Sequence, residues 1–115
     1  MGQRQRRVNE SIKEIVAELL PGLKDPRVGF VTVTDVRTTT DIRQAQVFYT
    51  VLPDDEETRR QTDAGLRSAA PILRRELGGR LRTRLTPELQ FVLDPVPERG
   101  RRIEELLRED RDREH

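Results

Sequence analysis

Residues 30–51 read FVTVTDVRTTTDIRQAQVFYTV, and this stretch contains two segments in which side chains of different polarity alternate. In residues 30–36, valines alternate with threonines. In the second segment one face carries Ala45, Val47, Tyr49 and Val51, and the other carries Gln44, Gln46 and Phe48. A period of two is typical of half-buried strands, and the polar residues 38–41 between the segments suit a turn. The stretch therefore predicts a β-hairpin.

Helices are predicted on both sides of the hairpin. Apolar residues recur every three or four positions from Val8 to Leu19, which predicts a helix over residues 4–20 with one apolar stripe. After Pro53, the acidic residues Asp54 and Glu57 suit the positive end of a second helix that continues to about Arg67.

Pro71 interrupts the next helical pattern. A proline deep inside a helix costs about 3 kcal/mol, whereas one in the first turn costs little. Ala69, Ala70 and Pro71 are therefore expected to separate two helices, the later one beginning near residue 70. Its apolar residues are Ile72, Leu73, Leu77 and Leu81. Thr86 and Pro87 then lead into a third alternating strand over residues 89–93.

The predicted order is helix, strand, strand, helix, helix, strand. This order describes an α+β domain with a three-stranded sheet and helices on one face, and it is also the type II KH arrangement. We expect residues 1–97 to form the domain. Residues 98–115 are expected to form a short amphipathic segment, with Ile103, Leu106 and Leu107, and a charged tail that frays.

The composition argues against enzymatic chemistry. The chain has no cysteine, and its one histidine is the last residue, His115, so neither a thiol or histidine nucleophile system nor a zinc site is expected. The acidic run 54–57 suits either a solvated helix start or a carboxylate site for metal or catalysis. No cofactor is expected. With no membrane span and no signal peptide, we expect a cytoplasmic monomer without a membrane partner.

Positive charge is concentrated between Arg67 and Arg84, although the net charge of the chain is only +1. This stretch holds one acid, Glu76, and its six arginines are candidate RNA ligands: Arg67, Arg74, Arg75, Arg80, Arg82 and Arg84. Arginine is suited to bidentate phosphate contacts. The alternative is a solvated basic face whose arginines pair with acids elsewhere in the fold.

Other candidate contacts lie outside this stretch. Arg4, Arg6 and Arg7 form a basic arm that suits RNA binding or only solubility. Lys24 and Arg27 flank the pentapeptide DPRVG at 25–29, which suits a turn into the first strand or a further phosphate contact. The rings of Tyr49 and Phe91 share the apolar registers of their strands and are predicted to be buried. Phe48 is predicted on the opposite face.

Short motifs in this chain resemble the ribosome-binding factor A family from about residue 4 to Leu107. The motifs are RRV at 6–8 leading into Ile12, DPRVG at 25–29 followed by VTVT at 31–34, DI at 41–42 with AQV at 45–47, and LTPELQF at 85–91. Each motif is short, but they occur in the same order and at suitable spacings.

The resemblance implies a type II KH-like domain of the bacterial cytoplasm, with no catalytic activity. It implies binding to the immature small (30S) ribosomal subunit, help in maturing the 16S RNA near its ends, and a role in cold adaptation. The Ala-x-Gly helix interruption of that family maps onto Ala69, Ala70 and Pro71, so proline stands where the family has glycine. Proline has no amide hydrogen to donate to RNA.

A different function is also open from the sequence. Residues 98–115 carry an amphipathic pattern that suits a protein partner, and this would make the chain a protein-interaction module. Deleting these residues separates the two functions, since RNA binding through the arginines would survive the deletion.

Overall fold

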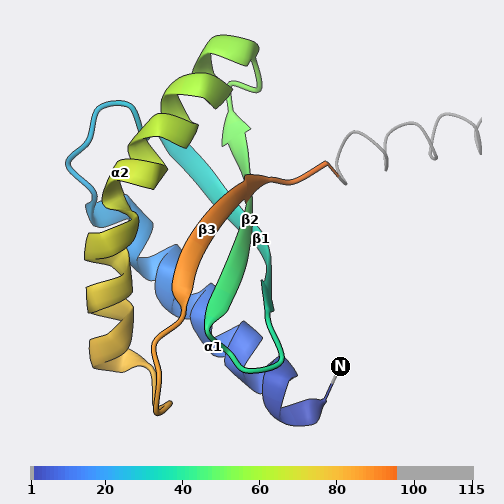
Figure 1. Cartoon of the computed structure of the whole chain (residues 1–115). Coiled ribbons are helices and arrows are strands. Elements are labelled where there is room, and N and C mark those ends of the chain that lie inside the picture. Colours follow the sequence, from blue (N-terminus) through green and yellow to red (C-terminus); the bar gives the residue numbers. More distant parts are fainter. Residues whose placement is uncertain (1, 96–115) are drawn as a thin grey trace, which may run out of the picture.

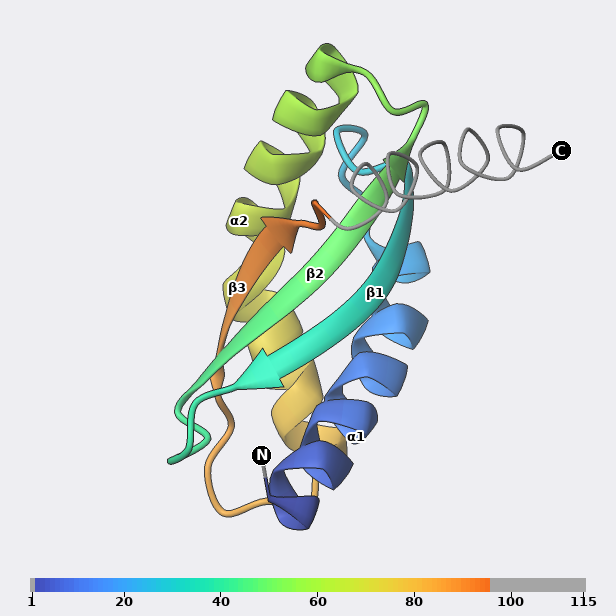
Figure 2. The ribbon, with the colours of Figure 1, turned by 90° about the vertical axis from the view of Figure 1, so that its right-hand side faces the viewer.

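Two helices lie on one face of a three-stranded sheet, and neither helix covers the opposite face (Figure 1 and Figure 2). The computed structural model describes residues 2–95. Its elements are α1 (Gln3–Leu19), the 3-10 turn η1 (Leu20–Gly22), β1 (Phe30–Thr38), β2 (Gln44–Leu52), α2 (Glu56–Arg80) and β3 (Glu88–Leu93). The α+β class and the three predicted strands are confirmed. The amphipathic segment predicted at 98–115 lies outside the described residues.

Helix α1 presents a buried apolar stripe to the sheet. Val8, Ile12 and Val16 recur at intervals of four residues, which places them on the same side of an α-helix. All three are buried in the core. The α-helix gives way to η1 where Pro21 enters the chain, and these bounds agree with the helix predicted from about residue 4 to residue 20.

The sheet is mixed, and β2 lies between its two neighbours. It pairs antiparallel with β1 and parallel with β3. A parallel neighbour requires a crossover connection, which α2 supplies. The register pairs Val33 with Tyr49 and Val47 with Phe91, so these buried side chains face the helices together. The rings of Tyr49 and Phe91 pack edge to face with centroids 6.4 Å apart, and their predicted burial is confirmed.

The face of the sheet that the helices leave uncovered is mainly polar. Phe48 lies on this face because it alternates with the buried Val47 and Tyr49, as the sequence predicted. The guanidinium carbon of Arg37 lies 5.7 Å from the centroid of the Phe48 ring, which is within the range of a cation–π interaction. The Arg37 side chain therefore partly covers the Phe48 ring on this face of the sheet.

The prediction that Ala69, Ala70 and Pro71 separate two helices is wrong. A single helix, α2, runs through Pro71, although Figure 1 shows that its axis changes direction partway along. Proline removes the hydrogen bond to the carbonyl four residues earlier and bends helices at that point. The core face is nevertheless continuous across the proline, since Ala69 and Leu73 are both buried. Packing of both halves on the sheet thus outweighs the local cost.

Helix α2 begins at an acidic N-cap. The Thr58 amide donates a hydrogen bond of 2.7 Å to Oδ1 of Asp55, and this bond lowers the pKa of the Asp55 carboxyl below its ordinary value. The capping carboxylate is one residue later than predicted, since Asp54 instead accepts a 2.7 Å hydrogen bond from Nε of Arg59. The acidic run therefore acts as a helix start.

Two glycines of α2 are expected to respond oppositely to alanine. A Cβ at Gly65 would lie 2.6 Å from Cγ2 of Val28, so Gly65→Ala should lower the free energy of unfolding by roughly 1–2 kcal/mol. Nothing lies within 4 Å of a Cβ at Gly79, so Gly79→Ala should raise it by roughly 0.5–1 kcal/mol through helix propensity. Urea unfolding measures both changes. A stabilised Gly65→Ala protein would contradict the close approach of Val28.

Candidate nucleic-acid interface

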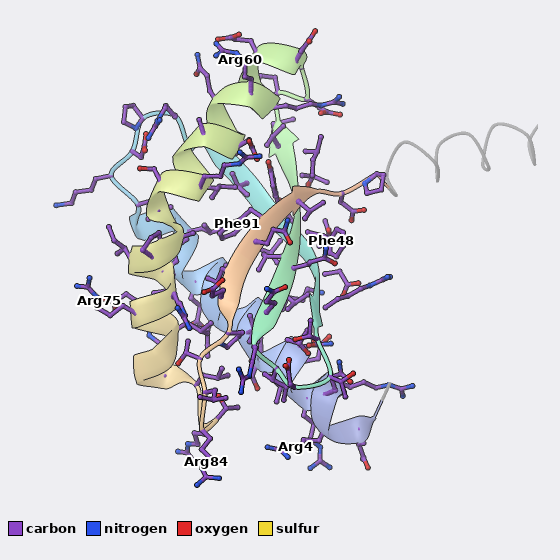
Figure 3. All side chains as sticks on the ribbon, viewed as in Figure 1. Arg4, Phe48, Arg60, Arg75, Arg84 and Phe91 are labelled. Atoms are coloured by element: carbon purple, nitrogen blue, oxygen red, sulfur yellow. The ribbon has the colours of Figure 1, made fainter. Side chains whose placement is uncertain are left out.

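Three basic segments far apart in the sequence lie at the same end of the molecule. They are the first turns of α1, the hairpin turn between β1 and β2, and the loop between α2 and β3 (Figure 1 and Figure 2). Figure 3 shows Arg4 and Arg84 at this end and Arg60 at the opposite end. We call it the basic end, and its arginines are Arg4, Arg6, Arg7, Arg43, Arg82 and Arg84.

Half of the candidate arginines between residues 67 and 84 have no acidic partner in the described part of the chain. These are Arg75, Arg82 and Arg84, all of them exposed. Arg82 and Arg84 belong to the loop of the basic end, and Arg75 points away from the sheet on the outer side of α2 (Figure 3). A guanidinium group that makes no internal hydrogen bond keeps its N–H donors for phosphate oxygens.

The other three candidates are engaged within the fold. Nε of Arg67 lies 3.1 Å from a carboxylate oxygen of Asp63, one helical turn away. Nη1 of Arg80 lies 3.2 Å from Oε2 of Glu18 and joins the end of α2 to α1. The alternative predicted from the sequence, that arginines pair with acids elsewhere, thus describes Arg67 and Arg80. Both pairs are exposed, so phosphate can still compete for them.

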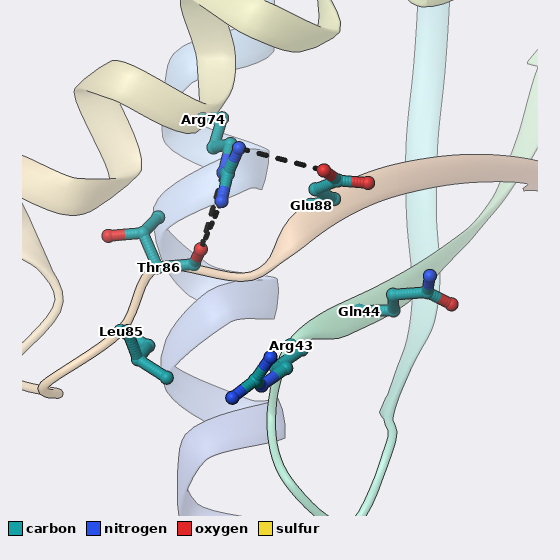
Figure 4. Close-up of a pocket in the computed structure, with 6 residues that line it drawn as sticks. All are labelled: Arg43, Gln44, Arg74, Leu85, Thr86 and Glu88. Carbon is teal, nitrogen blue, oxygen red and sulfur yellow. Dashed lines mark hydrogen bonds and ion pairs between the residues drawn. The ribbon is translucent and has the colours of Figure 1, made fainter.

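Arg74 fastens the loop of the basic end to α2 (Figure 4). Its Nε and Nη2 donate hydrogen bonds of 3.2 and 3.0 Å to the carbonyl oxygen of Thr86, and its Nη1 lies 3.9 Å from Oε1 of Glu88. Gly78 permits this close approach, since a Cβ there would lie 2.8 Å from Oγ1 of Thr86. The sequence predicted Arg74 as an RNA ligand, and in the structure its side chain makes a contact that positions the loop.

Two grooves meet at Arg74. One is lined by Arg43, Gln44, Arg74, Leu85, Thr86 and Glu88, and the other by Arg67, Ala70, Pro71, Arg74, Glu88 and Leu89. Arg43 was not among the sequence candidates, because only the parallel pairing of β2 with β3 brings the hairpin turn to α2. The Glu88 amide donates a 2.9 Å hydrogen bond to the carbonyl of Arg43 at this junction. Arg43 itself lies 3.7 Å from the carboxylate of Asp41.

Lys24 and Arg27 lie outside the basic end. Their segment packs against the middle of α2 at Gly65. The pentapeptide forms the predicted turn, in which the Val28 amide donates to the carbonyl of Asp25 at 3.0 Å. The Arg27 side chain donates several hydrogen bonds to the Asp25 carboxylate, the shortest 2.6 Å, and these lower the pKa of that carboxyl to about 2. Arg27 is thus already paired with an acid.

Other kinds of site find no support in residues 2–95. This part of the chain holds no group of three or more side chains that could bind a metal ion. Within the same residues, no helix has both the length and the apolar character needed to cross a membrane. The chemistry that the described residues do offer is a surface of guanidinium groups, which suits binding of phosphate oxygens.

Fold and site together define an α+β protein of the type II KH-like class with an arginine-rich end, a surface of the kind that binds nucleic acid. Residues 4–107 match the protein-family model described as "Ribosome-binding factor A". The chain therefore belongs to the ribosome-binding factor A family.

Individual relatives agree with this membership. The ribosome-binding factor A of Clavibacter michiganensis subsp. michiganensis is 54% identical over 112 residues, which are 96% of this chain and 67% of that protein. The crystal structure of ribosome-binding factor A from Thermus thermophilus gives a TM-score of 0.69 at 28% identity, covering 77% of this chain and 94% of that one. A homology model of the Thermus thermophilus factor, fitted into the cryo-EM map of a 30S complex, gives a TM-score of 0.61 at 30% identity and covers 73% and 88%.

Proposed function

We propose that this protein binds the immature small (30S) ribosomal subunit and assists the maturation of its 16S RNA. The observation that carries the proposal is the group of exposed arginines at one end of a chain that belongs to the ribosome-binding factor A family, among them Arg82 and Arg84, which have no acidic partner within residues 2–95. The relative fitted into the map of a 30S complex supports the small subunit as partner. Arginines that neutralise RNA phosphates release counterions, which supplies affinity without base recognition.

The candidate residues divide into three proposed roles. Arg75, Arg82 and Arg84 contact phosphates directly, because they are exposed and unpaired within residues 2–95. Arg4, Arg6 and Arg7 extend the same surface from α1. Arg74 holds the loop that carries Arg82 and Arg84, and Arg43 lines a groove beside it. Arg67, Arg80, Lys24 and Arg27 contribute less, because three of them already have acidic partners and Lys24 lies away from the basic end.

The proposed role is binding without catalysis, in the cytoplasm, by a monomer. The family membership supports binding without catalysis, and the sequence has no cysteine and one histidine, His115. A larger requirement for the protein in the cold is also expected, because incorrectly paired RNA helices persist longer at low temperature. The alternative function, a protein-interaction module built on residues 98–115, lies outside the described residues and is not favoured by the family membership.

Sedimentation through sucrose gradients tests the proposal. The tagged full-length protein in a lysate of its own cells is expected to migrate with free small subunits at low salt and to leave them at high salt, because phosphate contacts weaken with ionic strength. It should be absent from translating ribosomes. Protein that remains at the top of the gradient at every salt concentration would overturn the proposal.

Deletion of residues 98–115 provides the matched comparison in the same gradients. Retained migration with small subunits is expected, because the arginines of the basic end are all present in the shortened chain. Loss of migration in a protein that unfolds normally would instead support the protein-interaction alternative.

A further inference from the structure

Two apolar pairs lie on the otherwise polar face of the sheet that the helices leave uncovered, with Thr32 and Thr50 between them, and we call the two pairs the apolar strip. It consists of Phe30, Leu52, Phe48 and Val92. Phe30 is 79% exposed and Leu52 is 67% exposed, and the β1–β2 register places these two directly opposite each other. Phe48 pairs with Val92 across β2 and β3, and both are half-buried. Adjacent apolar side chains that remain in water favour a partner that covers them.

The described chain reaches its end on this same face. Beyond β3, the amide of Asp94 donates a 2.8 Å hydrogen bond to the carbonyl of Tyr49 on β2. The hydroxyl of Thr34 on β1 donates to the Asp94 carboxylate, so that side chain reaches across β2. Figure 1 shows the segment after β3 leading away from the helices, and Figure 2 shows the uncovered face toward the viewer. The last residues that the structure describes therefore lie on the uncovered face, next to Thr34 and between the two apolar pairs.

The remaining chain contains one short apolar cluster. Of residues 96–115, only Val96, Ile103, Leu106 and Leu107 have large aliphatic side chains apart from Pro97. Ile103, Leu106 and Leu107 have the spacing i, i+3, i+4, which would put all three on one face of a helix.

We propose that residues 98–107 cover the apolar strip of their own chain, with Ile103, Leu106 and Leu107 against Phe30, Leu52 and Phe48. The linker between β3 and this cluster is long enough to reach the apolar strip. Eight residues from Pro95 to Ile103 span up to roughly 25 Å when extended, whereas Leu52 lies three residues beyond Tyr49, or roughly 10 Å along β2.

A segment of the same chain is a better occupant than a second copy. Covalent attachment through a short linker gives the segment an effective concentration in the millimolar range, whereas a second copy is present only at its solution concentration. The proposed contact uses the uncovered face of the sheet and not the basic end. It is therefore independent of the function proposed above, and the two can fail separately.

Cross-linking tests the proposal cleanly, because the chain has no cysteine of its own. The test variant is Thr32→Cys with Asp110→Cys. Thr32 is exposed on the uncovered face and pairs with Thr50, and position 110 follows Leu106 and Leu107 by four and three residues. With a short bismaleimide at low protein concentration, we expect cross-linking within single chains at least about tenfold faster than in Ser68→Cys with Asp110→Cys. Ser68 is exposed on α2, away from the uncovered face.

The decisive control adds Leu106→Asp and Leu107→Asp to the test variant. Cross-linking should then fall to the rate of the Ser68→Cys control, because the apolar contact is removed and the tether is unchanged. Equal cross-linking rates for the Thr32→Cys and Ser68→Cys proteins would overturn the proposal. A C-terminal segment that does not dock would encounter both positions equally often. Cross-linked dimers as the main product would overturn it in favour of a second copy as the occupant.

Discussion

Replacing Arg82 and Arg84 together by glutamate is expected to lower the affinity for purified small ribosomal subunits by on the order of 10- to 100-fold at about 0.1 M salt. Both side chains are exposed and have no acidic partner in residues 2–95. Each is therefore available to neutralise one phosphate. Loss of two such contacts should reduce the slope of log affinity against log salt by about 1.4, taking roughly 0.7 per contact with single-stranded RNA. A binding titration at several salt concentrations measures both quantities.

Arg59→Glu with Arg60→Glu is the matched control for this prediction. Either double replacement changes the net charge from +1 to −3, because each arginine removed is replaced by an acid. Arg60 lies at the end of the molecule opposite Arg84 (Figure 3) and pairs with Glu57 at 2.6 Å. We expect the control to leave both affinity and salt slope nearly unchanged. An equal loss in the two proteins would mean that net charge, and not the basic end, determines binding.

Pro71→Ala is expected to raise the free energy of unfolding by roughly 1–3 kcal/mol. Proline in a helix interior costs about 3 kcal/mol relative to alanine, and it leaves the carbonyl of Arg67 without its helical donor. Pro71 is exposed, so its removal loses little packing. The observed gain should be smaller than the full cost, because the two halves of α2 are already packed in the bent arrangement. Chemical unfolding in urea measures the change.

Ser68→Ala is the comparison for Pro71→Ala. Ser68 is also exposed within α2, so this replacement reports helix propensity alone and should raise the free energy of unfolding by only a few tenths of a kcal/mol. A Pro71→Ala protein less stable than the unchanged chain would show that the bend itself is needed for packing. The same protein should also be tested for subunit binding, since straightening α2 would move Arg74 and the loop that it holds.

Elements with a clear local pattern could be predicted from the sequence. The valine and threonine alternation of β1 and the apolar repeat of α1 are properties of neighbouring residues. The local backbone geometry alone decides which side of the strand or helix each of these side chains lies on. The inward direction of Tyr49 and Phe91 followed from the same rule. The prediction at Pro71 is wrong because the local cost of a proline does not include the packing of Ala69 and Leu73, which depends on the whole sheet.

The candidate site was predictable in part. The sequence could identify the density of arginines between residues 67 and 84, because this is a local count. It could not separate Arg67, which pairs with Asp63, from Arg84, which has no acidic partner within residues 2–95, since pairing depends on which acids the fold brings near. It also missed Arg43, which lines a groove with Arg74 only because β2 pairs in parallel with β3.

The sequence by itself therefore determined the element types, the inward faces of the strands and the presence of a basic stretch. These features arise from short-range periodicity and composition, which do not depend on how distant parts of the chain pack together. Only the tertiary structure decided that α2 is continuous, that Arg74 holds the loop through Thr86, and that three separate basic segments share one end. Those outcomes depend on contacts between residues distant in sequence, whose energies are set by the completed packing of helices on sheet.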